Sequence, residues 1–264
     1  MNDEFLANVK EMAKLANKEL GQNYLVDLTI AKRIVDLLNV DKNDKVLEIG
    51  CGFGSLSVFL MDKNCKKLIL NDIDQRALDF INTIKNAPCI ETINKSALKL
   101  DLKPYTKIVS NLPYYLTNDL LEYCLCKSNA KRLLFMCQKE VFERLIIKAK
   151  NNEYGPLAIL IHHFGDIQKS FLVSRDAFMP KPHIDSLVFF IDKTCDNSIN
   201  RYQYLQFLKR MFLHRRKTIF NNLSLYLMNK QKAESVLKQC DTSILMRPEQ
   251  VEPDVYLKIF KCIN

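Results

Sequence analysis

Lys45 to Gly54 read KVLEIGCGFG, and this stretch decides the fold class of the chain. Residues Lys45–Gly50 form a short apolar run that ends at a glycine, as expected of a strand buried in a parallel sheet. The glycines that follow have the spacing G-x-G-x-G, which lets the backbone of the turn approach a ligand closely. Ser55 to Met61 then favour a helix, whose first N–H groups can bind that ligand. The stretch therefore predicts a strand, a ligand-binding turn and a helix.

Apolar runs and helical patterns continue to alternate along the chain. Further strand candidates are Lys67–Leu70, Cys89–Ile93, Lys107–Ser110, Arg132–Met136, Ile167–Ser174 and Ser186–Asp192. Helical patterns separate several of them, for example over Asp119–Cys126 and Lys139–Lys148. This alternation predicts an α/β fold with a doubly wound, mostly parallel sheet. The last two strand candidates follow each other across a proline-containing turn, so we expect an antiparallel pair at one edge.

A change of composition after Asp192 indicates a second domain. Residues 193–200, KTCDNSIN, are polar and turn-rich, as a linker would be. Beyond them, apolar residues recur at helical spacing in Tyr202–Phe212, Arg215–Asn229, Lys232–Gln239 and Pro253–Lys261. We therefore predict an α/β domain over residues 1–192 and a small all-helical domain over residues 193–264.

Composition limits the possible partners. The formal net charge of +9 and the pI near 9.0 favour a polyanionic partner such as nucleic acid. No apolar secretory core is visible near the start, and the longest apolar stretches are far shorter than the roughly 20 residues that span a membrane. We expect a cytoplasmic protein without a membrane partner.

The nine cysteines indicate reduced thiols in a chain that shows no secretory signal. They form no C-x-x-C pair, and no Cys/His cluster has the spacing of a zinc site; Cys124-x-Cys126 comes closest. Small buried side chains explain such cysteines well. The sequence predicts neither disulfides nor a bound metal.

The glycine turn favours S-adenosylmethionine as its ligand. Its spacing differs from the G-x-G-x-x-G of dinucleotide enzymes, and no Gly-Lys-Ser/Thr follows to form a phosphate loop. Asp72 ends the second strand candidate about 20 residues further on, where a carboxylate can bind ribose hydroxyls. NAD is the alternative ligand, and the turn alone could be an ordinary strand–helix connection.

Asn111-Leu112-Pro113-Tyr114 follow another strand candidate and suit the binding of a flat heterocycle that carries an amine. The Asn111 side-chain oxygen and a nearby backbone carbonyl can accept the two protons of an exocyclic NH2. Pro113 has no N–H to compete and stiffens the turn. Tyr114 offers a ring for stacking on a base. The alternative is a turn initiated by asparagine.

A basic stretch in the helical region suits an RNA partner. Arg215, Arg216 and Lys217 are consecutive, and Lys209 and Arg210 lie one or two helical turns earlier. Such cations can bind phosphates without reading the base sequence. The alternative is a solvated helix face without a partner.

Several of these motifs together resemble the KsgA family, the S-adenosylmethionine-dependent adenine dimethyltransferases of small-subunit ribosomal RNA. The similarity extends from about Gly21 to Leu223. The motifs, with the family pattern in parentheses, are Gly21–Leu25 (GQNFL), Glu48–Gly54 (EIGPGxG), Asn111–Tyr114 (NLPY), Gln138–Val141 (QKEV), Phe178–Ser186 (FxPxPKVDS) and His214–Leu223 (QRRKTLRNNL). The resemblance implies a Rossmann-like class I methyltransferase fold and a C-terminal helical RNA-binding domain.

The resemblance also implies a role for particular residues. The implied cofactor-binding residues are Gln22, Asn23, Leu25, Glu48, Gly50, Gly52, Asp72, Ser96 and Asn111. The implied catalytic residues are Asn111, Leu112, Pro113, Tyr114 and Phe178. Asn111 and the Leu112 carbonyl would orient the adenine N6, and the rings of Tyr114 and Phe178 would support the flipped base. The alternative for Phe178 is an aromatic side chain of the core.

The chain departs from the family pattern at several positions. Ser96, within Asn94–Leu98, replaces an aspartate of a GDAL-like element. A hydroxyl can still bind the adenine amine of the cofactor, but without a charge we expect weaker binding. Cys51 replaces a proline, Asp72 a glutamate and His183 a lysine.

The resemblance implies dimethylation of N6 on two adjacent adenosines in a hairpin loop near the 3′ end of 16S ribosomal RNA, and a role in small-subunit biogenesis. The implied partner is small-subunit ribosomal RNA or its precursor particle, and we expect a monomer. One alternative is an erythromycin-resistance type of 23S ribosomal RNA methyltransferase; the RRKT…NNL stretch favours the small-subunit family. The other is a non-catalytic assembly or nucleic-acid-binding factor, against which the intact Asn111–Tyr114 motif argues.

Overall fold

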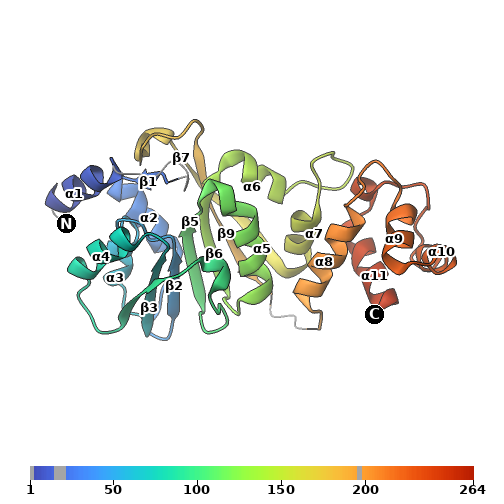
Figure 1. The fold of residues 1–264 in the computed structure, drawn as a ribbon, viewed down its shortest axis with the longest axis horizontal. Coiled ribbons are helices and arrows are strands. Elements are labelled where there is room, and N and C mark those ends of the chain that lie inside the picture. The colour runs from blue at the N-terminus through green and yellow to red at the C-terminus, as the bar shows by residue number, and fades with distance from the viewer. Residues whose placement is uncertain (1–2, 15–21, 195–197) are drawn as a thin grey trace. The chain divides into compact units, whose positions relative to one another are not determined.

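The computed structural model describes residues 3–14, 22–194 and 198–264. Its sheet has the strand order β4-β3-β2-β5-β6-β9-β7 (Figure 1). The strands are β2 Lys45–Ile49, β3 Lys67–Asp72, β4 Ile90–Asn94, β5 Lys107–Asn111, β6 Arg132–Gln138, β7 Gly165–Val173 and β9 Ser186–Lys193. Strands β4, β3, β2, β5 and β6 pair in parallel, and β9 is antiparallel to β6. The predicted mostly parallel sheet is confirmed, with β7 and β9 adjacent at one edge.

Helices cover both faces of the sheet, as the continuous apolar run of β2 predicted. Val46 and Leu47 are neighbours in β2 and point to opposite faces, yet both are at most 1% exposed. Val46 packs in one core cluster with Ala31 and Ile34 of α2. The helices of this part are α1 Asp3–Ala13, α2 Leu28–Leu37, α3 Ser57–Met61, α4 Gln75–Ile84, α5 Thr117–Lys127 and α6 Lys139–Leu145.

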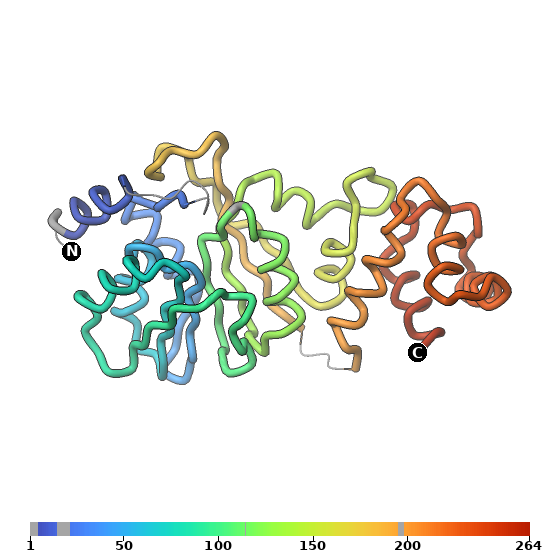
Figure 2. The backbone as a smooth tube through the Cα atoms, in the orientation of Figure 1, coloured from blue at the N-terminus to red at the C-terminus, as the bar shows by residue number. Residues whose placement is uncertain are grey.

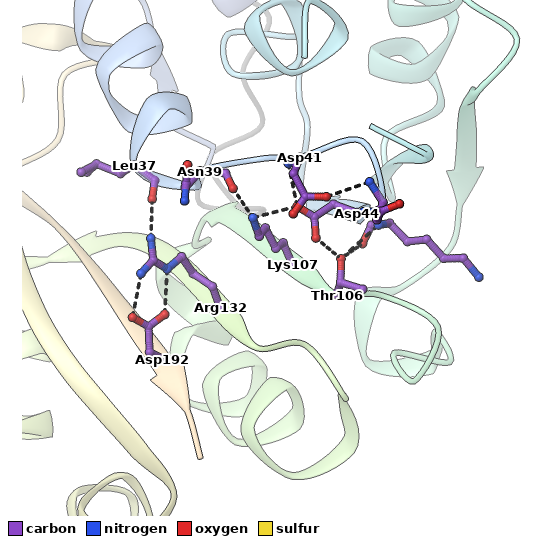
Figure 3. Close-up of polar contacts among 10 residues, drawn as sticks. Leu37, Asn39, Asp41, Asp44, Thr106, Lys107, Arg132 and Asp192 are labelled. Carbon is purple, nitrogen blue, oxygen red and sulfur yellow. Dashed lines mark hydrogen bonds and ion pairs between the residues drawn. The ribbon is translucent and has the colours of Figure 1, made fainter. Parts of the chain in front are cut away.

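A polar network secures the edge of the sheet where β2, β5 and β6 begin (Figure 3). Lys107 Nζ lies 2.7 Å from Asp44 Oδ2, and Thr106 Oγ1 donates to Asp44 Oδ1 at 2.7 Å. Arg132 donates to both carboxylate oxygens of Asp192 at 2.7 Å. Burial alone would raise the pKa of Asp44, but hydrogen bonds from Lys107, Thr106 and a backbone N–H lower it. This edge is opposite the strand ends where α/β proteins bind ligands, so we assign the network to stability.

The chain forms two compact units, and their boundaries correct the predicted domains. The first unit comprises residues 1–142 and 167–193, and the second comprises residues 143–166 and 194–264. The predicted division after residue 192 agrees closely with the second boundary, but residues 143–166 join the helical unit instead of the sheet unit. Their helix α7, Pro156–Phe164, was not predicted. Its apolar side chains Ile159, Leu160 and Phe164 are buried, and the chain then returns into β7 (Figure 2).

The second unit is helical, as predicted for its C-terminal part. Besides α7 it contains α8 Arg201–Met211, α9 Ile219–Leu227, α10 Lys230–Gln239 and α11 Pro253–Ile263. The helix predicted to begin at Arg215 begins only at Ile219, because the Thr218 side chain caps it by accepting a hydrogen bond from the Asn221 N–H. Arg215, Arg216 and Lys217 therefore lie in the turn before α9. In the described parts of the chain, no helix is long and apolar enough to cross a membrane.

Candidate active site

A pocket opens where β2, β3, β4 and β5 end, at the edge where open α/β sheets bind their ligands. It is lined by residues that directly follow these strands and by an N-terminal segment. The lining residues are Gln22, Asn23, Tyr24, Leu25, Glu48, Ile49, Gly50, Cys51, Gly52, Ser55, Leu56, Asn71, Asp72, Ile73, Lys95, Ser96, Ala97, Asn111, Leu112, Pro113, Tyr115, Leu116 and Leu120. Every residue predicted to bind the cofactor is among them.

The glycine turn forms the floor of the pocket in a conformation that requires glycine. Gly50 and Gly52 have φ angles of +69° and +49°, in the left-handed region. A Cβ atom on Gly52 would also lie 2.8 Å from Cε1 of Tyr24. The Asn71 carbonyl accepts hydrogen bonds from the N–H groups of Gly50 and Cys51 at 2.8 and 3.0 Å. The turn is therefore fixed to the end of β3.

Asp72 is the carboxylate at the end of β3, and its oxygens organise the turn. Oδ2 accepts a hydrogen bond from the Gly52 N–H and Oδ1 one from the Asp74 N–H, both at 2.8 Å. Burial raises the pKa of this carboxyl, although the two hydrogen bonds oppose the shift. Each oxygen keeps a further lone pair for a ligand. The predicted binding of ribose hydroxyls by Asp72 stays a prediction.

Glu48 lies beneath the turn and is 2% exposed. Burial raises the pKa of its carboxyl to about 8, and a 2.6 Å hydrogen bond from Ser57 Oγ opposes the shift. Near neutral pH this side chain is therefore mostly protonated, so it can act as a hydrogen-bond donor as well as an acceptor.

Replacing Glu48 with glutamine should flatten the dependence of stability on pH. An unfolded chain loses the Glu48 proton near the ordinary pKa of 4.5, whereas the folded protein holds it to about pH 8. Between these values the folded state binds more protons, so the unaltered protein loses stability as pH rises, by up to roughly 1 kcal/mol per pH unit. Urea unfolding of both proteins across this range measures the difference, and parallel profiles would contradict the assignment.

The segment that follows β4 is held by a buried asparagine that the sequence did not single out. Asn71 Nδ2 donates to the carbonyls of Ile93 and Lys95 at 2.9 and 2.7 Å, which fixes the segment that carries Ser96. Ile73 is 56% exposed and lines the same part of the pocket. An exposed apolar side chain beside polar ones suits the flat face of a nucleobase. The only indication of this role in the sequence is that β3 ends in two polar residues, Asn71 and Asp72.

Replacing Ser96 with aspartate should tighten the binding of S-adenosylmethionine, by about fivefold, if Ser96 faces the adenine amine. The physical reason is that a carboxylate accepts a stronger, charge-assisted hydrogen bond than a hydroxyl. Calorimetric titration measures the affinity, and Ser96→Asn is the matched neutral control. Unchanged or weaker binding by Ser96→Asp would place the amine elsewhere.

The Asn111 side chain is oriented by a long-range hydrogen bond. Its Nδ2 donates to the Asn23 carbonyl at 3.2 Å, so Oδ1 is directed away from that contact as an acceptor. The Leu112 N–H donates to the Met136 carbonyl of β6 at 2.9 Å, which fixes the backbone after Asn111. Asn111, Leu112 and Pro113 all line the pocket.

Two tyrosines, Tyr114 and Tyr115, directly follow Pro113. The side chain of Tyr114 lies outside the described part of the structure, so its stacking role stays a prediction. Tyr115 lines the pocket and is 52% exposed, and it was not predicted from the sequence as a site residue. Its position directly after the motif was the only available signal. An exposed ring at the edge of a pocket is suited to stacking on a base.

Phe178 is not among the residues that line this pocket, and its predicted place beside the adenine stays a prediction. It is 4% exposed and packs in the core cluster that contains Leu25 and Val188. It lies in β8, Phe178–Met179, which pairs antiparallel with β1, Tyr24–Leu25. This position corresponds to the alternative of a core aromatic. Phe178 supports the wall through Leu25, its partner in the strand pair.

The N-terminal motif closes the pocket from the side of β1. Gln22, Asn23 and Leu25 all contribute to the lining, and Gln22 Nε2 donates to Asp74 Oδ2 at 3.4 Å. Ser55 Oγ donates to the Leu25 carbonyl at 2.5 Å, which joins this segment to the residues after the glycine turn. Gly21 lies outside the described residues.

The predicted RNA-binding cations lie in the second unit, on α8 and in the turn before α9. Lys209, Arg210, Arg216 and Lys217 are exposed. Arg215 is also exposed, but its guanidinium donates to the carbonyls of Asn152 and Tyr154 at 2.7 and 2.6 Å. These bonds join the turn to residues 143–166 of the same unit, so they give Arg215 a structural role that the sequence did not reveal.

Asn222 holds the same basic turn from below. It is 2% exposed, and its Nδ2 donates to the carbonyls of His214 and Thr218, while its Oδ1 accepts from the His214 N–H. These hydrogen bonds hold the two ends of the turn, residues 214 and 218, together. Arg216 and Lys217 are thus presented on a fixed backbone.

The fold and the pocket together define an S-adenosylmethionine-dependent methyltransferase of the Rossmann-like class. The pocket fits that cofactor, since it combines a glycine turn, the acceptors Asp72 and Asn111, and apolar side chains such as Ile73 and Leu116. The family model described as ribosomal RNA adenine dimethylase matches residues 13–264. The chain therefore belongs to the ribosomal RNA adenine dimethylase family.

Relatives match over nearly their full lengths. Ribosomal RNA small subunit methyltransferase A of Malacoplasma penetrans is 34% identical over 263 residues, which cover 97% of this chain and 95% of that protein. The protein of the same name from Lactobacillus johnsonii is 33% identical over 268 residues, covering 92% and 89%.

Solved structures share the fold. A dimethyladenosine transferase from Plasmodium falciparum has a TM-score of 0.75 at 24% identity, with 89% of this chain and 95% of that one covered. The 23S rRNA methyltransferase ErmE has a TM-score of 0.65 at 21% identity, with 90% and 98% covered. At these identities the two structures establish the fold alone.

Proposed function

We infer that this protein dimethylates N6 of adenosine in small-subunit ribosomal RNA, using S-adenosylmethionine as the methyl donor. Its family and the full-length similarity to small-subunit methyltransferases support this function. The observation that carries it is the position of Asn111, which lines the pocket and whose Nδ2 donates to the Asn23 carbonyl, so that its oxygen would serve as the acceptor for a substrate amine. By family resemblance we propose two adjacent adenosines near the 3′ end of 16S ribosomal RNA as targets.

The proposed chemistry needs orientation more than it needs a base. The lone pair of adenine N6 is delocalised into the ring, so the amine is a poor nucleophile. The Asn111 oxygen and the Leu112 carbonyl would accept its two protons and favour the pyramidal geometry that localises the lone pair. The cofactor supplies a methyl group activated by the positive charge of its sulfonium. The residues that line the pocket would hold the adenine N6, the methyl carbon and the cofactor sulfur roughly in line.

Two successive transfers follow from the same contacts. Each transfer would leave the cofactor as a neutral thioether and would release one proton from N6 to solvent. After one methylation N6 therefore keeps a single proton, which one of the two acceptors can still bind. After the second, no proton remains and neither acceptor has a donor, which should weaken product binding. Glu48, although mostly protonated near neutral pH, is 2% exposed beneath the turn, and the proposed mechanism assigns it no proton transfer.

We propose that Asp72 binds the ribose hydroxyls and Ser96 the adenine amine of the cofactor. The residues proposed to contact its remaining surface are Gln22, Asn23, Leu25, Glu48, Gly50, Gly52 and Asn111. All of these residues line the pocket. We further propose that the protein acts as a monomer in the cytoplasm, where it would meet the precursor of the small subunit.

The basic turn of the second unit would bind RNA phosphates. Replacing both Arg216 and Lys217 with alanine should weaken binding to small-subunit RNA and reduce the slope of log affinity against log salt by roughly one to two. The exposed pair Lys230 and Lys232 on α10 provides a matched control, since its removal changes the charge equally. Equal losses in the two double variants would show a general charge effect and no specific role for the turn.

The decisive experiment offers the purified protein, with S-adenosylmethionine, to small ribosomal subunits from cells that lack this methyltransferase. We expect dimethyladenosine to form in the small-subunit RNA, detected by mass spectrometry of mapped fragments. Modification of large-subunit RNA instead would favour the erythromycin-resistance type of enzyme. Binding to small subunits without any transfer would favour a non-catalytic assembly factor and would overturn the enzymatic proposal.

A further inference from the structure

A cluster of metal-binding side chains lies in the second unit, apart from the residues of the pocket. The last turn of α7 carries His162 and His163, and the first turn of α11 carries Asp254. His162 Nε2 and His163 Nδ1 lie 3.8 and 3.9 Å from the same oxygen, Asp254 Oδ1. All three ligand atoms lie within 4.8 Å of one another.

The environment of His163 fixes which of its nitrogens carries the proton. Its side chain is only 7% exposed, and Nε2 lies 3.0 Å from the Pro253 carbonyl oxygen. A carbonyl accepts but never donates, so Nε2 must be the protonated nitrogen. With a proton on Nε2, the other ring nitrogen, Nδ1, faces the Asp254 carboxylate and lies 3.9 Å from its Oδ1.

The three side chains offer a ready set of metal ligands. His162 Nε2, His163 Nδ1 and Asp254 Oδ1 are all atoms that can bind a metal ion, and they lie within 4.8 Å of one another. A cation between these atoms can contact all three at once.

We propose that His162, His163 and Asp254 bind a divalent transition-metal ion, with zinc as the best match to two imidazoles and one carboxylate. Zinc takes such ligands at about 2.0–2.2 Å in tetrahedral geometry, with the fourth position open to water. The Pro253 carbonyl on Nε2 is the outer contact that commonly orients a metal-binding histidine. Tetrahedral ligands at these distances lie about 3.4 Å apart, so the separations of 3.8 and 3.9 Å from Asp254 Oδ1 would have to shorten by about half an ångström. The two outer ligands can move, since His162 and Asp254 are 55% and 77% exposed.

The bound ion would connect α7 to α11. These helices belong to the two separate stretches of chain that make up the second unit, residues 143–166 and 194–264. Zinc would thus secure the inserted segment against the C-terminal helices, and it would take no part in methyl transfer. This role is independent of the proposed reaction.

The test measures zinc binding by the purified full chain, by calorimetry and by the rise in melting temperature. We expect one ion per chain, with affinity reduced at least tenfold in Asp254→Asn and in His162→Gln. Both residues are exposed, so these variants should fold normally. The variant His163→Gln removes the third proposed ligand, which is buried. Cobalt substitution should give a visible spectrum without the intense sulfur-to-metal band of thiolate sites.

Two controls separate this cluster from other ligands. Cys240 and Cys262 have their sulfur atoms 3.8 Å apart and could bind zinc themselves, so the double variant Cys240→Ser, Cys262→Ser should keep the ion. His183→Gln removes an exposed histidine outside the cluster and should also keep it. The absence of zinc binding by the unaltered chain would overturn the proposal, as would binding that survives Asp254→Asn and His162→Gln unchanged.

Discussion

Replacing Asn111 with alanine should lower the rate of methyl transfer by about 10²- to 10³-fold, the usual cost of removing one polar group that acts on the transition state. The side chain supplies the acceptor that the mechanism aims at N6, and its orientation depends on the hydrogen bond from Nδ2 to the Asn23 carbonyl. RNA affinity should persist, because the proposed phosphate contacts belong to the second unit. Single-turnover transfer and RNA binding, measured on the same preparation, give the two quantities.

The variant Asn129→Ala is a matched control for this prediction. Asn129 is exposed in the same unit, and its side chain donates to the Lys103 carbonyl at 3.2 Å, away from the lining residues. It should transfer methyl groups at the rate of the unaltered protein. If Asn111→Ala retained more than about a tenth of the rate, the amide would not be the group that orients N6.

Replacing Phe178 with alanine should destabilise the first unit by about 3–5 kcal/mol, the range found when a large buried aromatic is truncated. Phe178 packs against the core that contains Leu25, and β8 pairs with β1. Because Leu25 also lines the pocket, cofactor affinity and transfer rate should fall together. Urea unfolding, calorimetry with S-adenosylmethionine and transfer assays measure the three effects.

A loss of methyl transfer alone would support the predicted role of Phe178 beside the flipped adenine. A side chain that only supports the flipped adenine would cost transfer far more than cofactor affinity, with stability almost unchanged. Phe189→Ala provides the comparison, since Phe189 is 0% exposed in β9 and packs against Phe135 and Phe142, away from the pocket lining. It should lose similar stability while the folded fraction binds the cofactor normally.

Local patterns predicted the sheet well but did not reveal elements that depend on distant partners. β2 was predicted over Lys45–Gly50 and observed over Lys45–Ile49, because an apolar run ended by glycine specifies a buried strand without further context. The two-residue strands β1 and β8 were missed, since each exists only because the other lies beside it. Helix α7 was missed because its short apolar run has too little periodicity to distinguish a helix from a strand.

The sequence by itself determined the class of fold, the position of the pocket and part of its lining, including the glycine turn and Asn111. Strand periodicity, positive-φ glycines and short motifs are encoded within a few residues of one another, so they can be read before any contact is known. Tertiary structure alone decided what the individual side chains do. The bond that orients Asn111 spans 88 residues, and the one that sets the His163 tautomer spans 90. The burial of Phe178 and the carbonyl contacts of Arg215 are equally non-local. A side chain's partners depend on which distant segments pack beside it, and local spacing carries no information about that packing.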